Sequence, residues 1–153
     1  MQAQVDTNSV IKANNQFWEQ MLAMSVDPLP GLDGIVIGER HLLSWVGLHG
    51  AWNGRIEVRM TSPLALTATA AMMMSPPEAV GEADTLDAAK EIANMIAGVI
   101  KSSLPRPCSM SVPESQVDPA VYADPPQTDD TLTVAFRHES GDMMVRIVEQ
   151  QAA

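Results

Sequence analysis

Two polar residues with helical spacing are the strongest candidates for chemistry in this sequence. Glu91 and Asn94 lie in the stretch DAAKEIANMIAGVIKSS (87–103), in which apolar residues recur with the period of an α-helix. Residues at positions i and i+3 of a helix are neighbours on its surface, so the two side chains would project from one face. That face is the solvent side of the predicted helix, where a carboxylate and a carboxamide could act on another molecule.

The predicted helix runs from about residue 85 to residue 103 and has two opposite stripes. The apolar stripe consists of Ala88, Ala89, Ile92, Met95, Ile96, Val99 and Ser103. The polar stripe consists of Asp87, Glu91, Asn94, Gly98 and Lys101. An asparagine is a mediocre helix former, and a glycine inside a helix costs about 1 kcal/mol relative to alanine. A helix that carries both on its exposed side is therefore a candidate functional surface.

Structural explanations stay open for the charged residues of the polar stripe. Asp87 falls in the first turn of the predicted helix, where a negative charge suits the helix dipole and could cap the helix. Glu91 on an exposed face is usually just solvated, and Lys101 near the C-terminus is favoured by the dipole. Asn94 and Gly98 have no equally good structural explanation, so the functional interpretation depends mainly on them.

Familiar catalytic and metal-binding patterns are missing from the rest of the sequence. His41, His49 and His138 have no second histidine or cysteine at metal-ligand spacing, and Cys108 is the one cysteine. The sequence contains no GxSxG, P-loop or GxGxxG motif. We expect Cys108 and the methionines at 72–74 to be core residues, and the tryptophans to be core or interface residues. The sequence thus predicts no metal site and no bound cofactor.

The composition limits the classes of partner and the number of domains. The 153 residues predict a single domain, residues 1–153, with a normal apolar fraction of 46%. A net charge of −10 argues against nucleic acid and against an anionic membrane surface as partners. We also find neither an apolar run of 18 residues nor a signal peptide at the N-terminus. These features and the single cysteine lead us to expect a cytoplasmic protein.

Hydrophobic patterning predicts an α/β (α+β) fold with about three helices packed on a mixed six-stranded sheet. The predicted helices cover residues 7–24, capped by Asp6 or Thr7, residues 64–74 and residues 85–103. The predicted strands cover residues 32–39, 42–52, 55–60, 109–112, 131–138 and 142–149. Asn53 and Gly54 predict a hairpin turn between two of these strands. Residues 113–130 hold four prolines without a helical period, and predict a long loop or an extended excursion.

The segment EIANMIAGVIKSSL (91–104) closely resembles the signature helix of the CheX-like branch of the CheC/CheX/FliY family of chemotaxis phosphatases. This family has a Glu-x-x-Asn motif, often with Asp or Ser four residues before the Glu, and Asp87, Glu91 and Asn94 match it. The resemblance covers nearly the whole chain: NQFWEQML (15–22), GAWNGRIEVRMTSPLALTATAAMM (50–73) and MSVPESQV (110–117) resemble the flanking segments.

The resemblance implies a phosphatase that hydrolyses the aspartyl phosphate of a response-regulator receiver domain such as CheY. Asn94 would then orient the attacking water, because an amide both donates and accepts hydrogen bonds. Glu91 would pair with the active-site lysine of the receiver, which also supplies the Mg²⁺. Asp87, Gly98 and Lys101 are the expected partner-binding residues, Gly98 because a missing side chain allows close approach of the partner backbone.

The chain contains one Glu-x-x-Asn motif, as CheX-type members do, and such members form homodimers, so the resemblance implies a homodimer with two sites. Two alternatives stay open: a non-catalytic module that binds a receiver, and a structural dimerisation domain. The presence of both Glu91 and Asn94 favours the phosphatase, because a scaffold needs neither residue. The receiver and its signalling pathway are not specified by the sequence.

Overall fold

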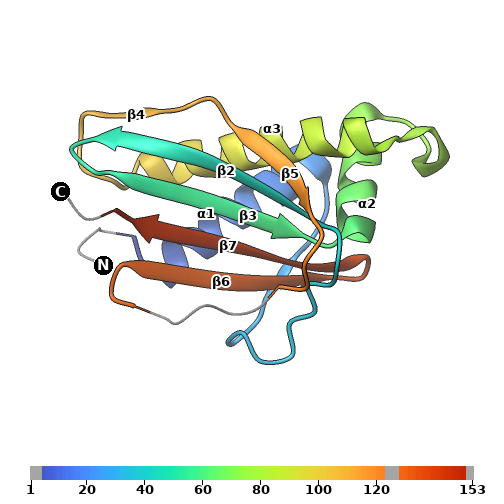
Figure 1. The fold of residues 1–153 in the computed structure, drawn as a ribbon, viewed down its shortest axis with the longest axis horizontal. Coiled ribbons are helices and arrows are strands. Elements are labelled where there is room, and N and C mark those ends of the chain that lie inside the picture. Colours follow the sequence, from blue (N-terminus) through green and yellow to red (C-terminus); the bar gives the residue numbers. More distant parts are fainter. Residues whose placement is uncertain (1–4, 123–127, 151–153) are drawn as a thin grey trace.

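A computed structural model of the chain describes residues 5–122 and 128–150, in which three long helices lie on one face of an antiparallel sheet (Figure 1). The helices are α1 (Thr7–Leu22), α2 (Ser62–Met73) and α3 (Glu82–Lys101), with a 3-10 turn, η1 (Pro77–Ala79), before α3. The strands are β1 (Asp27–Pro28), β2 (His41–Gly50), β3 (Gly54–Met60), β4 (Cys108–Met110), β5 (Glu114–Asp118), β6 (Thr131–His138) and β7 (Gly141–Glu149).

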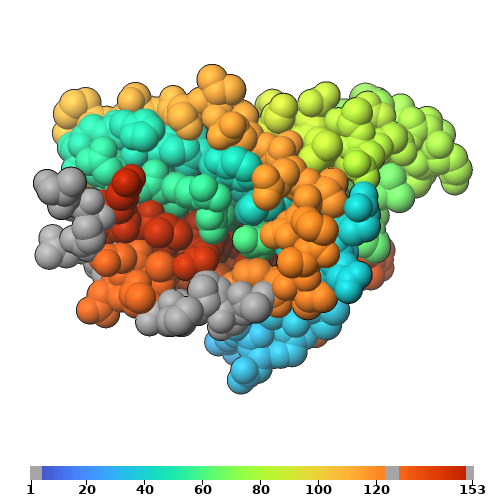
Figure 2. Space-filling model, in the orientation of Figure 1, coloured from blue at the N-terminus to red at the C-terminus, as the bar shows by residue number. Residues whose placement is uncertain are grey.

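The sheet is built around two long hairpins that lie next to each other. The strand order is β1-β6-β7-β3-β2-β4, and β5 pairs with the other half of β2. Every pairing between the described strands is antiparallel. The helices cover one face only, and Figure 2 shows the side chains of the strands at the surface of the other face. No helix in residues 5–122 and 128–150 combines the length and the apolar character needed to cross a bilayer.

The α+β class with three helices on a sheet is confirmed, whereas the details of the sheet need correction. Over residues 5–122 and 128–150, the sheet has seven strands in place of six, and antiparallel pairing in place of a mixed sheet. The predicted strand at 32–39 is wrong, since residues 32–39 form no strand and Val36 is 66% exposed. That segment is held from the side, where the Val36 amide donates to Asp142 Oδ2 (2.8 Å) and Arg137 donates to the Gly34 carbonyl (2.9 Å).

Alternation along the strands places apolar side chains under the helices. In β3, Ile56, Val58 and Met60 are buried, and they alternate with charged residues as the sequence predicts. The predicted hairpin between β2 and β3 is confirmed, but its connection consists of residues 51–53, and Gly54 is already the first residue of β3, paired with Leu48. Gly54 has to be a glycine, since a Cβ there would collide with the Trp52 ring and the Val148 carbonyl oxygen.

The predicted excursion at 113–130 contains an edge strand. Residues 114–118 form β5 and pair with β2, and Ser115 Oγ donates to the Leu86 carbonyl of α3 (2.8 Å). Asp118 ends this strand and accepts a hydrogen bond from Arg59 (3.0 Å). The part of the predicted loop at 123–127 lies outside the described residues. The edge strand β5 thus connects the sheet to α3, which is the helix that bears the candidate site.

Candidate functional site

The helix α3 is held rigidly because its inner face is completely buried. Its apolar residues pack on β2 and β3 and against α1 and α2. The buried residues are Thr85, Ala88, Ala89, Ile92, Ala93, Ile96, Ala97 and Ile100. The predicted stripe was therefore too narrow. It omitted Ala93, Ala97 and Ile100, while Met95 and Val99 are only half-buried and Ser103 lies beyond the helix end.

Both ends of α3 are fixed by local hydrogen bonds. At the start, Asp84 Oδ2 accepts from the Gly81 amide (2.9 Å), and Glu82 and Asp84 place negative charge in the first turn. At the end, the Leu104 amide donates to the Lys101 carbonyl (3.0 Å), and the Leu104 side chain is buried. A helix with a buried inner face and two fixed ends is a rigid support for side chains on its outer face.

The outer face of α3 carries the five residues predicted for it. Asp87, Glu91 and Gly98 are exposed, while Asn94 and Lys101 are half-buried. At about 100° per residue, all five fall within an arc of about 80° around the helix axis. The structure therefore brings every predicted site residue onto one surface.

Glu91 and Asn94 have no partner inside the described part of the chain. No hydrogen bond or ion pair within residues 5–122 and 128–150 involves either side chain. Their i, i+3 spacing keeps the two Cβ atoms about 5–6 Å apart. A carboxylate and a carboxamide that support no internal contact are available to a second molecule.

The structural explanation for Asp87 as a helix-start residue is wrong. α3 begins at Glu82, so Asp87 lies in the second turn, and Gly81 occupies the capping position. The Asp87 side chain is 80% exposed and lies 4.0 Å from Lys90 Nζ, the outer limit of an ion pair. Lys101, by contrast, is the last residue of α3, where the helix dipole does favour a cation.

Gly98 is not required by the packing of this chain. A Cβ built at Gly98 would meet no atom within 4 Å, and the backbone there is ordinary helix. Gly98 opens onto a hollow of about 440 Å³, lined by Gly98, Lys101, Ser102, Arg106, Pro107 and Cys108. Arg106 was not predicted as a site residue. The sequence signal was a lone arginine between two prolines directly after the candidate helix.

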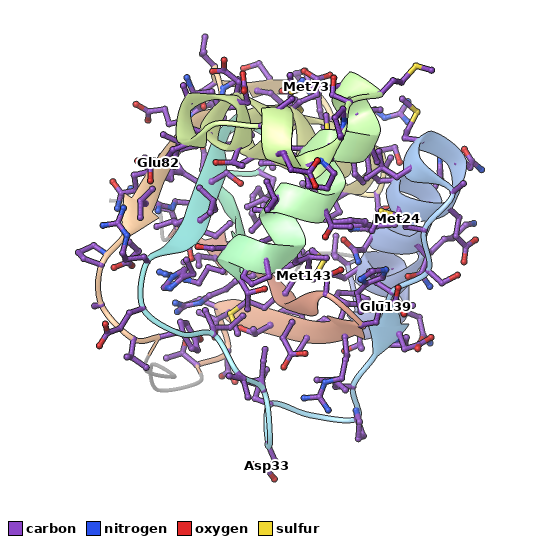
Figure 3. The ribbon with its side chains drawn as sticks, turned by 90° about the vertical axis from the view of Figure 1, so that its right-hand side faces the viewer. Met24, Asp33, Met73, Glu82, Glu139 and Met143 are labelled. Atoms are coloured by element: carbon purple, nitrogen blue, oxygen red, sulfur yellow. The ribbon has the colours of Figure 1, made fainter. Side chains whose placement is uncertain are left out.

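A second, larger cavity lies at the opposite end of the sheet, apart from Glu91 and Asn94. It has a volume of about 1160 Å³, and its lining includes Met24, after α1, and Glu139, in the turn between β6 and β7 (Figure 3). Arg137 and Asp142 form an ion pair in its wall (2.8 Å). The hydrogen bonds that the Arg137 guanidinium donates to this carboxylate hold the pKa of Asp142 below its ordinary value. Arg137 and Asp142 therefore neutralise each other, while Asp27, Glu39 and Glu139 of the same lining have no ion pair within the described residues.

The side chains of His41 and His138 make hydrogen bonds within the chain. His41 is buried, with Nδ1 2.9 Å from the Gly38 carbonyl and Nε2 2.6 Å from Arg59 Nη1. His138 accepts from the Ser140 amide, and His49 is exposed. In the stretches 5–122 and 128–150, no group of three His, Cys, Asp or Glu side chains could hold a metal ion. Cys108 is half-buried, with its thiol 3.5 Å from the Trp52 carbonyl.

The sequence model of the chemotaxis phosphatase CheX family matches residues 42–137, which include the whole outer face of α3. The match spans more than half of the chain, and the protein therefore belongs to the CheX family. Among curated proteins, none matches the chain.

Solved structures share the fold at low sequence identity. Chemotaxis protein CheX from Vibrio vulnificus has a TM-score of 0.76 and 17% identity, covering 98% of this chain and 100% of that one. A CheC-like protein from Shewanella sp. PV-4 has a TM-score of 0.74 and 17% identity, covering 96% and 100%. CheX from Borrelia burgdorferi, solved in a CheX-CheY-BeF3-Mg²⁺ complex, has a TM-score of 0.72 and 19% identity, covering 94% and 97%.

Proposed function

We propose that this protein hydrolyses the aspartyl phosphate of a response-regulator receiver domain of the CheY type. The observation that carries the proposal is the pair Glu91 and Asn94, exposed or half-exposed on a rigid helix and without internal partners. Membership of the CheX family supports it. The Borrelia burgdorferi relative of the same fold, seen in complex with CheY, supports a receiver as the partner.

The reaction is the hydrolysis of an acyl phosphate. The oxygen of a water molecule attacks phosphorus, the bond between phosphorus and the aspartyl oxygen breaks, and both protons of the water stay with the departing inorganic phosphate. The leaving group is a carboxylate, which leaves readily, so catalysis depends mostly on the position of the water and on electrostatics. Such a reaction does not require a nucleophile or a metal from this chain.

Asn94 is the residue that orients the water in this proposal. Its carbonyl oxygen can accept a hydrogen bond from the water, and its NH₂ group can donate to a phosphoryl oxygen. Because Asn94 sits on the outer face of a fixed helix, it can enter a partner's site without rearrangement of the fold.

Glu91 sets the register between the two proteins by pairing with the active-site lysine of the receiver. Asp87 and Lys101 contact the partner from the two ends of the same face, and Gly98 allows the partner backbone to approach. The Mg²⁺ belongs to the receiver in this proposal and neutralises phosphoryl charge there. The homodimer with two sites and the cytoplasmic location stay predictions, and sedimentation equilibrium would test the former.

The test is a dephosphorylation assay with a panel of purified receivers. Each receiver is phosphorylated with a small-molecule donor and Mg²⁺, and loss of the phosphoryl group is followed with and without this protein. Faster loss from at least one receiver is the expected result. Unchanged loss from every receiver, together with tight binding of one of them, would establish the non-catalytic binding module in place of the phosphatase.

A further inference from the structure

The hollow beyond Gly98 holds two cations that the chain leaves unmatched. Six of the nine lysines and arginines lie within 4.0 Å of a carboxylate oxygen: Arg40, Arg55, Arg59, Lys90, Arg137 and Arg146. Within the described residues, Lys12, Lys101 and Arg106 have no ion pair or side-chain hydrogen bond. Two of these three line the same hollow. In a chain with a net charge of −10, this is a local positive site.

The wall that carries Arg106 is fixed to the sheet. The Ala51 amide donates to the Pro107 carbonyl (2.8 Å), and Cys108 pairs with Gly50 in the β2–β4 ladder. Gly50 has a φ of +135°, and a Cβ there would collide with the Pro107 carbonyl oxygen, so the two segments are in close contact. The opposite wall is the end of α3. The hollow is therefore formed before any partner arrives.

The shape and position of the hollow suit a side chain of a docked protein. Four of its six lining residues, Gly98, Ser102, Arg106 and Pro107, are exposed, so it is an open depression and not an enclosed ligand site. Its lining residues come from the C-terminal end of α3 and from the segment that leads into β4, and both segments lie at the left of Figure 1. Lys101 is seven residues beyond Asn94, which is about 10 Å along the helix axis.

Charge changes sign from the outer face of α3 to the hollow at its C-terminal end. Asp87 and Glu91 place negative charge before Asn94, while Lys101, the last residue of α3, and Arg106, beyond the helix, place positive charge after Gly98. A partner whose lysine meets Glu91 can present a carboxylate to Lys101 and Arg106 in one orientation only. Complementary charges of this kind fix register and speed association more than they raise raw affinity.

We propose that the hollow between Lys101 and Arg106 receives one or more Asp or Glu side chains from the surface of the receiver, about 10 Å from its phosphorylated aspartate. This inference rests on the proposed function, because it takes the receiver as the partner of α3. Arg106 would donate up to two parallel hydrogen bonds to the carboxylate, and Lys101 would add a second cation. Gly98 leaves room for the partner beside them.

The test compares three charge-reversal variants of the chain of residues 1–153. The double variant K101E/R106E should raise KM for the phosphorylated receiver by about tenfold and leave kcat unchanged. K101E alone should show part of this effect. The matched control is Lys12→Glu, which makes the same change in net charge as K101E at an exposed, unpaired cation on α1. We expect Lys12→Glu to change KM less than twofold.

A binding measurement separates this inference from the proposed function. Affinity for a receiver loaded with beryllofluoride and Mg²⁺, measured by calorimetry, does not require catalysis. Weaker binding of K101E/R106E, and restored binding when a receiver Asp or Glu is changed to Lys, would support the hollow even if no receiver were dephosphorylated. Equal binding of wild type and double variant, or an equal loss in Lys12→Glu, would overturn it. A wild-type protein that neither binds nor dephosphorylates any receiver would overturn both proposals.

Discussion

Glu91 and Asn94 lie three residues apart on the outer face of α3, and no other side chain of the described chain engages either of them. Directly beneath them, Ile92, Ala93 and Ile96 are completely buried. The same turn of helix therefore combines a fixed backbone with two polar groups that have no internal role. That combination supports the proposal that this face of α3 contacts a second molecule.

Replacing Glu91 by Gln keeps the shape of the side chain and removes its charge. We expect KM for the phosphorylated receiver to rise about tenfold, because hydrogen bonds between charged groups contribute about 1.5–3 kcal/mol. The melting temperature should not change, since Glu91 has no partner in the described structure. Steady-state kinetics and thermal unfolding measure the two effects. Glu19→Gln, at an exposed position on α1, is the control, and an equal rise in KM there would contradict a specific role for Glu91.

Replacing Gly98 by Ala should stabilise the protein and weaken its function. The new Cβ meets no atom within 4 Å, so the helix gains about 0.5–1 kcal/mol in free energy of unfolding. The same Cβ occupies the surface that the receiver approaches, so the affinity for the receiver should fall. The larger side chain of Gly98→Leu should lower this affinity more. Urea unfolding and calorimetric titration measure the two effects. Unchanged affinity in both variants would show that no partner approaches Gly98.

Gly54 provides a contrast to Gly98, because its missing side chain is needed for folding. A Cβ at Gly54 would collide with the Trp52 ring and the Val148 carbonyl oxygen. We therefore expect Gly54→Ala to destabilise the protein by about 1–3 kcal/mol, the usual cost of overpacking. Urea unfolding of the two alanine variants should give changes of opposite sign, and changes of equal sign would contradict this distinction.

Asp142 should make stability depend on pH at the acid end. Hydrogen bonds from the Arg137 guanidinium lower the pKa of Asp142 in the folded protein, and the Val36 amide adds to the effect. Because the folded pKa lies below the unfolded pKa, the contribution is complete above about pH 4 and is lost as pH falls through the folded pKa.

Asp142→Ala should therefore lower the free energy of unfolding by about 1–3 kcal/mol at pH 7, and by less at low pH. Urea unfolding of wild type and variant at pH 7 and near pH 3 measures the difference. Asp33→Ala is the control, because Asp33 is exposed at the tip of a loop (Figure 3). If the difference in free energy of unfolding between wild type and Asp142→Ala grew as the pH fell, the predicted direction of the pH dependence would be contradicted.

The elements with strong local signals could be predicted from the sequence. The helices α1 and α3 have regular apolar spacing, and the Asn53-Gly54 signal for a hairpin lies between two apolar runs. The segment 32–39 was predicted wrongly because Ile35, Val36 and Ile37 look like a strand. Their fixation by Asp142 and Arg137, more than 100 residues away, leaves no local signal. The strand β5 was hidden in a proline-rich segment for the same reason, since its partner β2 is distant in sequence.

In the candidate site, too, some residues could be predicted from local sequence and others only from the folded structure. Residue types and spacing placed Glu91, Asn94 and Gly98 on one face, because helical geometry is local. The start of α3 at Glu82 was missed, and Asp87 was consequently given a helix-start alternative. Arg106 was missed because its approach to Lys101 depends on how residues 105–108 pack on β2. Only the folded chain brings that residue to the site.

The central claim is that Asn94 orients the attacking water, and Asn94→Ala tests it most directly. Rates of phosphoryl loss from a receiver should be measured with wild type and variant, at concentrations that saturate binding. We predict that the variant loses about a hundredfold or more in kcat, because misplacement of a reactant by about 1 Å already costs this much. Its affinity for the beryllofluoride-loaded receiver and its melting temperature should stay close to those of wild type. Full activity of Asn94→Ala would contradict the account, even if the protein proved to be a phosphatase.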